Sequence, residues 1–118
     1  MAIALDLGET GVAVLRFENE NDSYDAGKLR DLLGEAAADG RAILVDLSRA
    51  TFVDSTIVAA IIEGLRDSEA TGRRFSIFLP ADSGEYVRRL FSITGLDQVL
   101  PFTSAWDTAL AALRTPDD

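Results

Sequence analysis

The 118-residue sequence contains neither cysteine nor histidine. Without thiols there can be no disulfides and no thiolate nucleophiles, and without imidazoles the usual general base of a serine triad is missing. Most zinc and iron sites depend on the same two side chains. These absences exclude most familiar hydrolytic and metal chemistry. Only carboxylates remain to bind Mg²⁺ or to act as a glycosidase-like pair.

Basic charge and long apolar runs are also scarce. The chain has 11 basic residues against 20 acidic ones, a net charge of −9, whereas a nucleic-acid-binding protein needs a basic surface. No apolar run approaches the ~20 residues of a membrane-spanning helix, and the first residues lack the basic and apolar regions of a signal peptide. We therefore expect a cytoplasmic protein with no nucleic-acid partner and no membrane insertion, and the acidic balance favours a basic protein partner.

What is present is a core-forming pattern in which strands alternate with helices. Hydrophobic residues make up 47% of the chain, and its length is typical of one domain, so we expect a single domain over 1–118 with a frayed tail at 113–118. Strands are predicted over 2–6, 12–17, 42–47 and 74–79, with a short extended piece inside 94–102. Residues 18–24 read as a polar loop, and residues 48–52 read as a bridge to Asp54.

Helices are predicted over 25–38, 55–70 and 105–113. A further helix should begin at Asp82 or Ser83, because Asp82 and Glu85 have the spacing of a capping box. In the helix over 55–70, the helical period places one set of apolar side chains on the core face: Ile57, Ile61, Ile62 and Leu65. This alternation predicts an α/β fold whose central strands are parallel.

The joint inside "TFVDSTIVAAIIEGLR", residues 51–66, is the most informative stretch. A predicted strand leads through Asp54, Ser55 and Thr56 into an apolar helix, and such junctions lie at the carboxyl edge of an α/β sheet, where function gathers. One interpretation is a helix cap, since these residue types are preferred there. The other is a switch: the helix end tolerates a phosphate on a hydroxyl, while Asp54 repels it, which suits reversible modification.

Other polar and aromatic residues also allow two interpretations. Asp46 could join Asp54 in a metal or catalytic cluster, or it could simply accept a hydrogen bond from a neighbouring turn. The pair Arg88 and Arg89 could be a solvated face or a contact to an acidic partner. Trp106 could pack the last helix against the sheet or serve as an exposed anchor for a partner.

Residues 42–78, "AILVDLSRATFVDSTIVAAIIEGLRDSEATGRRFSIF", resemble the signature of STAS domains, named for sulfate transporters and anti-sigma factor antagonists. The family pattern is a hydrophobic strand ending in Asp-Leu-Ser, a short loop, then Phe-hydrophobe-Asp-Ser-Ser/Thr-Gly and an apolar helix. A later family motif resembles "VRRLFSITGLDQVLPF", residues 87–102, and Ala109-Leu110 matches a pair in the family's last helix. The resemblance covers residues 42–113 and implies a mixed sheet of four to five strands with four helices.

Stand-alone STAS proteins of this size resemble bacterial anti-sigma factor antagonists. The resemblance implies that the unmodified protein binds an anti-sigma factor with serine kinase activity, which frees a sigma factor for transcription. Phosphorylation of the motif serine breaks the complex, and a serine phosphatase resets it. On this basis Ser55 is the phosphoacceptor, Thr56 is a weaker candidate, and Asp54 orients the hydroxyl or caps the helix. The protein would be a binding module and a substrate, not an enzyme, with no cofactor and no metal.

The sequence departs from the family pattern at two places. Ile57 replaces the family glycine, and "ENENDSY" at 18–24 replaces a loop like Gly-Glu-Leu-Asp. Both lie in the expected partner-binding surface, which comprises Glu18, Glu20, Asp22, Ser55, Thr56 and Ile57. The departures favour an alternative, a non-phosphorylated STAS scaffold subunit of a lipid or solute ABC-type transporter. A nucleotide- or lipid-binding STAS module is a third hypothesis, although the chain lacks a Gly-x-x-x-x-Gly-Lys-Ser/Thr phosphate loop.

Overall fold

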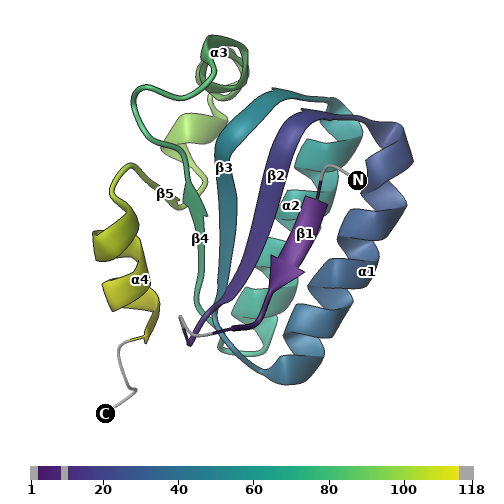
Figure 1. Ribbon diagram of the computed structural model, residues 1–118, viewed down its shortest axis with the longest axis vertical. Helices are drawn as coiled ribbons and strands as arrows, with labels where there is room; N and C mark the ends of the chain where they lie inside the picture. The colour runs from purple at the N-terminus through teal and green to yellow at the C-terminus, as the bar shows by residue number, and fades with distance from the viewer. Residues whose placement is uncertain (1–2, 9–10, 115–118) are drawn as a thin grey trace.

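A five-stranded mixed sheet forms the centre of the molecule (Figure 1). In the computed structural model, which describes residues 3–8 and 11–114, the spatial order of the strands follows their order in the chain. The first two strands are antiparallel and all other neighbours are parallel. The strands are β1 Ile3–Asp6, β2 Ala13–Asn21, β3 Ile43–Val53, β4 Phe75–Phe78 and β5 Phe102–Thr103. The predicted α/β fold with parallel central strands is confirmed.

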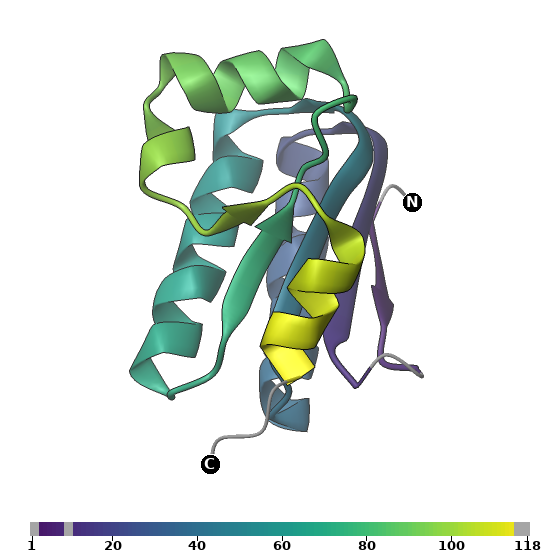
Figure 2. The ribbon, with the colours of Figure 1, turned by 90° about the vertical axis from the view of Figure 1, so that its left-hand side faces the viewer.

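The helices cover both faces of this sheet. They are α1 Ser23–Asp39, α2 Ser55–Ala70, α3 Glu85–Ile93 and α4 Trp106–Arg114, with a short 3₁₀ turn, η1, at Leu96–Gln98. Helices α1 and α2 lie side by side on one face, and α4 lies on the other (Figures 1 and 2). Helix α3 lies across the end of the sheet where β2 and β3 finish. No helix in the described part of the chain is long and apolar enough to cross a membrane.

Strands β2 and β3 divide the interior into two cores, because successive side chains of a strand point to opposite faces. Leu15, Phe17 and Val45 enter the large core beneath α1 and α2. Val14 and Leu44 enter a smaller core beneath α4. Residues 42–47 are apolar apart from Asp46, a composition typical of a strand covered on both faces, and β3 is covered in this way.

Both central strands are longer than the sequence pattern predicts. Residues 18–21, expected as a loop, continue β2 and pair with β3, which itself runs on to Val53. The register shifts twice, between Arg16 and Glu18 and between Asn19 and Glu20, and Asn19 has a left-handed φ of 58°. The added segment is polar because most of its side chains face solvent, so it lacks the apolar signal of a buried strand.

Helix boundaries also differ from the predictions. Helix α1 begins at Ser23, two residues before the predicted start. The capping box predicted at Asp82 and Glu85 is wrong: α3 begins at Glu85 after Gly84, with no side-chain cap. The chain is instead held close to β3, since a Cβ on Gly84 would lie 3.0 Å from the Ala50 carbonyl oxygen. Residues 113 and 114, expected as part of a frayed tail, belong to α4. Residue 2 of the first predicted strand and residues 115–118 lie outside the described residues.

Candidate functional site

The carboxyl ends of β2 and β3 bring two helix N-termini together at one edge of the sheet (Figure 1). Strand β2 ends at Asn21 and leads into α1 at Ser23, while β3 ends at Val53 and leads into α2 at Ser55. The N–H of Asp54 donates a hydrogen bond of 3.3 Å to the carbonyl of Asn21, which joins the two junctions. This is the edge at which ligands and partners of α/β sheets commonly bind.

Asp54 is the N-cap of α2. Its Oδ1 atom accepts hydrogen bonds from the N–H groups of Thr56 and Ile57, both at 3.1 Å, and from the Thr56 hydroxyl at 2.6 Å. The Thr56 hydroxyl is the largest cause of a lowered Asp54 pKa, and the N–H groups of Ile57, Thr56 and Ser23 lower it further. Asp54 is therefore a carboxylate committed to the first turn of the helix, which agrees with the cap interpretation.

The hydroxyl groups of Ser55 and Thr56, which follow this cap, differ in their hydrogen bonding. Both Ser55 and Thr56 are exposed. The Thr56 hydroxyl donates to Asp54, whereas no hydrogen bond involves the Ser55 hydroxyl within residues 3–8 and 11–114. An incoming phosphoryl group could reach the Ser55 oxygen without breaking a contact, but modification of Thr56 would remove one bond from the cap.

Ile57 does not lie on the surface. Its side chain is fully buried in the large core, so the prediction that it belongs to the partner-binding surface is wrong. The physical reason is the helical period, which turns this position toward the sheet together with Ile61. The replacement of the family glycine by isoleucine thus fills the interior and adds no bulk to the exposed edge.

The acidic residues expected on the partner-binding surface border the same edge. Glu18 and Glu20 are exposed on the last part of β2, where they pair in register with Arg49 and Phe52. Asp22 is also exposed, but it has a structural role as the N-cap of α1. Its Oδ1 accepts the Tyr24 N–H at 3.0 Å, and its own N–H donates to the Asp25 carboxylate at 3.2 Å.

Sequence reasoning missed the aromatic side chains at this edge. Tyr24, in the first turn of α1, is 94% exposed. Tyr86, in the first turn of α3, is half-exposed and stacks on Phe52 with ring centroids 5.1 Å apart. Exposed tyrosines are frequent anchors in protein interfaces. The available signal was their position: Tyr24 is the last residue of the predicted polar loop, and Tyr86 lies near the start of the helix predicted to begin at Asp82 or Ser83.

Asp46 lies apart from Asp54 and does not form a metal or catalytic cluster with it. It accepts a hydrogen bond from the Ser48 N–H at 2.9 Å, and since Ser48 belongs to β3, the donor is in the strand and not in the neighbouring turn that was expected. The Asp46 carboxylate is also 3.7 Å from the Arg16 Nε. Across the described ranges, no group of three or more carboxylates could hold a metal ion.

The remaining candidate residues, the Arg88–Arg89 pair and Trp106, lie outside the Ser55 edge. Arg89 forms a long contact of 3.7 Å with Glu85 on a solvated face of α3, where Arg88 is also exposed. Trp106 packs edge-on against Phe78 of β4 with ring centroids 5.1 Å apart. The ring contact with Phe78 confirms the interpretation that Trp106 packs the last helix against the sheet.

Comparison with known proteins gives a consistent family match. A family model described as "Mlab, STAS domain" matches residues 5–101. An anti-sigma factor antagonist from Mycobacterium paratuberculosis is 26% identical, with coverage of 96% of this chain and 93% of that one and a TM-score of 0.77. The phosphorylated form of the Bacillus cell fate determinant SpoIIAA is 22% identical, with coverage of 96% and 100% and a TM-score of 0.70. A STAS protein from Planctomyces limnophilus is 18% identical, with coverage of 96% and 98% and a TM-score of 0.71.

Proposed function

The chain belongs to the STAS domain family, and we propose that it is an anti-sigma factor antagonist that is switched off by phosphorylation of Ser55. The observation that carries this proposal is the exposed Ser55 hydroxyl, which has no hydrogen-bond partner in the described structure and stands beside the capping carboxylate of Asp54. The partner is an anti-sigma factor with serine kinase activity, and a serine phosphatase reverses the modification. The protein acts in the cytoplasm as a binding module and a substrate, not as an enzyme.

The geometry favours Ser55 over Thr56 as the phosphoacceptor. In phosphoryl transfer the Ser55 oxygen attacks the terminal phosphorus of a nucleoside triphosphate, the bond to the leaving diphosphate breaks, and the hydroxyl proton passes to a base of the kinase. Asp54 is a positioning residue in this step, because its Oδ1 already holds the first turn of α2. The same attack by Thr56 would first have to break its 2.6 Å bond to Asp54.

Charge explains how the modification would release a partner. A phosphate adds roughly −1.5 to −2 charges at pH 7, here on an edge that already carries Glu18, Glu20 and Asp22. A partner surface fitted to the unmodified edge would then face extra repulsion and desolvation. Because affinity falls tenfold for every ~1.4 kcal/mol, a modest penalty is enough to dissociate the complex.

The buried position of Ile57 supports this mechanism. A β-branched side chain on the surface would stand between a kinase and the Ser55 hydroxyl, but Ile57 is directed into the core. The approach to Ser55 therefore stays as open as it would be with glycine. The aromatic residues Tyr24 and Tyr86 supply apolar contact area near this approach.

The test is to weigh the intact protein recovered from its native cells and to fragment residues 51–66. We expect a gain of one phosphate on Ser55 that is lost in Ser55→Ala and retained in the matched control Thr56→Ala. A wholly unmodified population across growth and stress conditions would refute the switch and leave Asp54, Ser55 and Thr56 as a helix cap.

A second candidate function is a non-phosphorylated scaffold subunit of a lipid or solute ABC-type transporter. One observation favours it: the matching family model carries the name Mlab. Its test is reconstitution of a stable complex between the purified chain and a transporter ATPase, with Ser55→Ala binding as tightly as the wild type. Loss of that complex on phosphorylation of Ser55 would instead favour a switched protein.

A further inference from the structure

The carboxyl edge of β2 and β3 carries a second junction that is built like the one at Ser55. At the start of α2, Asp54 is the N-cap and Ser55 is the first helical residue. At the start of α1, Asp22 is the N-cap and Ser23 is the first helical residue. Both caps have an extended backbone, with φ −100° and ψ 179° at Asp54 and φ −127° and ψ −167° at Asp22. Ser23 therefore has the preceding residue and the backbone setting of the proposed phosphoacceptor.

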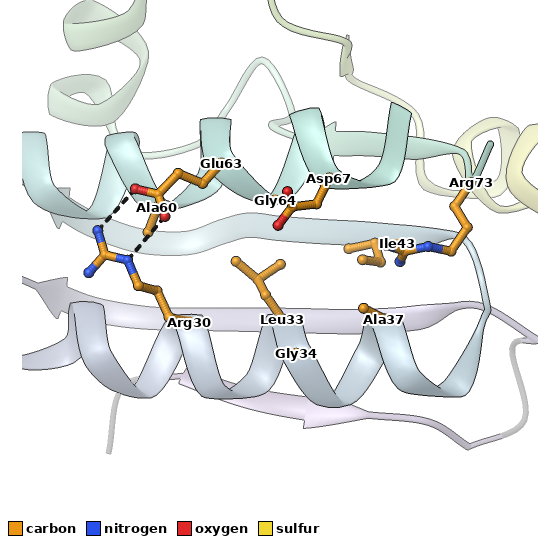
Figure 3. Close-up of a pocket in the computed structure, with 10 residues that line it drawn as sticks. All are labelled: Arg30, Leu33, Gly34, Ala37, Ile43, Ala60, Glu63, Gly64, Asp67 and Arg73. Atoms are coloured by element: carbon orange, nitrogen blue, oxygen red, sulfur yellow. Dashed lines mark hydrogen bonds and ion pairs between the residues drawn. The ribbon is translucent and has the colours of Figure 1, made fainter. Parts of the chain in front are cut away.

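Helices α1 and α2 run side by side from this edge with their starts level (Figure 3). Arg30, about two turns into α1, makes two hydrogen bonds of 3.2 Å to Glu63, about two turns into α2. Just beyond this pair the helices are in close contact, since a Cβ on Gly64 would lie 2.9 Å from a Leu33 methyl carbon. Because the two helices rise equally to these contacts, their first residues lie at the same level, about 10 Å apart.

The Ser23 hydroxyl is as open to modification as that of Ser55. Ser23 is exposed, and its hydroxyl forms no hydrogen bond with any residue of 3–8 or 11–114. The cap of α1 does not use this hydroxyl, because the Asp22 side chain accepts from the Tyr24 N–H and the Asp22 N–H donates to Asp25. A phosphoryl group can therefore reach the Ser23 oxygen without breaking a contact.

Exposure alone does not single out a serine in this chain. Ser92 and Ser104 are exposed as well, but Ser92 lies inside α3 and Ser104 lies in the connection between β5 and α4. Neither follows an aspartate. Among the exposed serines of the described residues, only Ser23 and Ser55 follow a capping aspartate at a helix start. Ser92 and Ser104 are thus internal controls for exposure without this junction.

We propose that Ser23 is a second phosphoacceptor at this edge, an inference that rests on the proposed function. The Ser23 oxygen attacks the terminal phosphorus of a nucleoside triphosphate, the bond to the leaving diphosphate breaks, and the hydroxyl proton passes to a base of the kinase. The product adds roughly −1.5 to −2 charges to the edge that carries Ser55. Phosphorylation of Ser23 therefore opposes partner binding in the same direction as phosphorylation of Ser55.

The two modifications should disfavour each other. Two phosphates that each carry nearly two negative charges, about 10 Å apart, repel one another through water and salt. At physiological ionic strength this repulsion amounts to about a twofold effect. We expect singly phosphorylated chains to predominate, and we expect the occupancy of Ser23 to rise about twofold when Ser55 is replaced by alanine.

The experiment is mass spectrometry of the full chain, recovered from its native cells under growth and stress conditions and cleaved after arginine and lysine. Ser23 and Ser55 then lie on separate peptides, residues 17–28 and 50–66. We expect a phosphate on the peptide 17–28 that is retained in the matched control Tyr24→Phe, lost in Ser23→Ala and about twofold more abundant in Ser55→Ala. Circular dichroism of the purified variants checks that each is folded.

The outcomes separate this inference from the proposed function. Phosphate on Ser55 with an unmodified 17–28 peptide, in the wild type and in Ser55→Ala alike, would overturn this inference alone. Phosphate on Ser23 but never on Ser55 would uphold it and refute the proposed acceptor, whereas a chain without any phosphate would overturn both. Equal phosphorylation of Ser92 or Ser104 would also overturn it, because exposure and not the Asp-Ser junction would then select the site.

Discussion

Replacement of Asp54 by alanine tests whether the cap at the candidate site contributes to stability. Oδ1 of Asp54 accepts two backbone N–H groups and one hydroxyl, and loss of an acidic N-cap typically costs 0.5–2 kcal/mol. Because three donors lose the same acceptor and Ile57 N–H is partly buried, we expect the upper end, about 2 kcal/mol. For a chain of this length, such a loss lowers Tm by about 8 °C.

Urea unfolding followed by circular dichroism measures this change. The midpoint should fall while the slope m stays constant, since the surface exposed on unfolding is the same. The matched control is Asp54→Asn, which retains a side-chain acceptor and a preferred cap residue and should cost clearly less. Equal stability of Asp54→Ala and the wild type would refute the reasoning that this carboxylate stabilises the start of α2.

The same variant has a predicted pH dependence. Hydrogen bonds lower the pKa of Asp54 in the folded protein below its ordinary value of 3.8. A carboxyl with a depressed folded pKa contributes stability that is fully present above its unfolded pKa and is lost as pH falls through the folded value. The stability difference between wild type and Asp54→Ala should therefore be constant at neutral pH and shrink below about pH 4. A difference that grows on acidification would contradict this sign.

Three further substitutions test other parts of the argument. Ile57→Gly, which restores the family residue, should destabilise the protein by at least about 3 kcal/mol in urea unfolding, because it empties a core position and adds a helical glycine; a neutral result would mean that Ile57 does not fill the core. Thr56→Val should raise the pKa of Asp54 toward its ordinary value, measured by NMR titration of the carboxyl carbon, because the largest cause of the shift is removed; an unchanged pKa would assign the shift to the backbone donors. Gly84→Ala should cost about 1–3 kcal/mol by pressing α3 away from β3. Gly27→Ala, whose Cβ would meet no described residue within 4 Å, should instead stabilise the protein by up to about 1 kcal/mol; equal effects of the two substitutions would refute close packing at Gly84.

The parts of the fold that depend on local apolar pattern could be predicted from the sequence. The run at 42–47 indicated a strand buried on both faces, and α2 has the bounds predicted from its cap and period. Residues 18–21 could not be recognised as strand, because their side chains are polar and their conformation depends on hydrogen bonds to β3, a partner distant in sequence. The start of α3 was missed for a similar reason, since at Gly84 the chain passes so close to β3 that an added Cβ would lie 3.0 Å from the Ala50 carbonyl oxygen, a long-range approach that the capping pattern does not reveal.

Ile57 shows how two kinds of sequence reasoning can disagree at the site itself. The helical period of α2 placed Ile57 on the core face, and the structure confirms this. Analogy with a family glycine placed the same residue on the partner-binding surface, which is wrong. Side-chain direction follows from the backbone of this chain, so periodicity was the better guide. The exposed tyrosines escaped both kinds of reasoning, because neither period nor family pattern marks a solvent-facing aromatic.

The caps at the carboxyl edge also determine what a phosphate on Ser55 could do there. A helix N-terminus normally offers unpaired N–H groups to an anion. In α2, however, the N–H groups of Thr56 and Ile57 already donate to the Asp54 side chain, and that of Val58 donates to the Asp54 carbonyl. A phosphate would have to displace a carboxylate to gain these donors. We therefore expect it to remain outside the helix end and to act on a partner by charge, with the far-ultraviolet circular dichroism of the phosphorylated chain unchanged; a large change would mean that the cap is rebuilt around the phosphate.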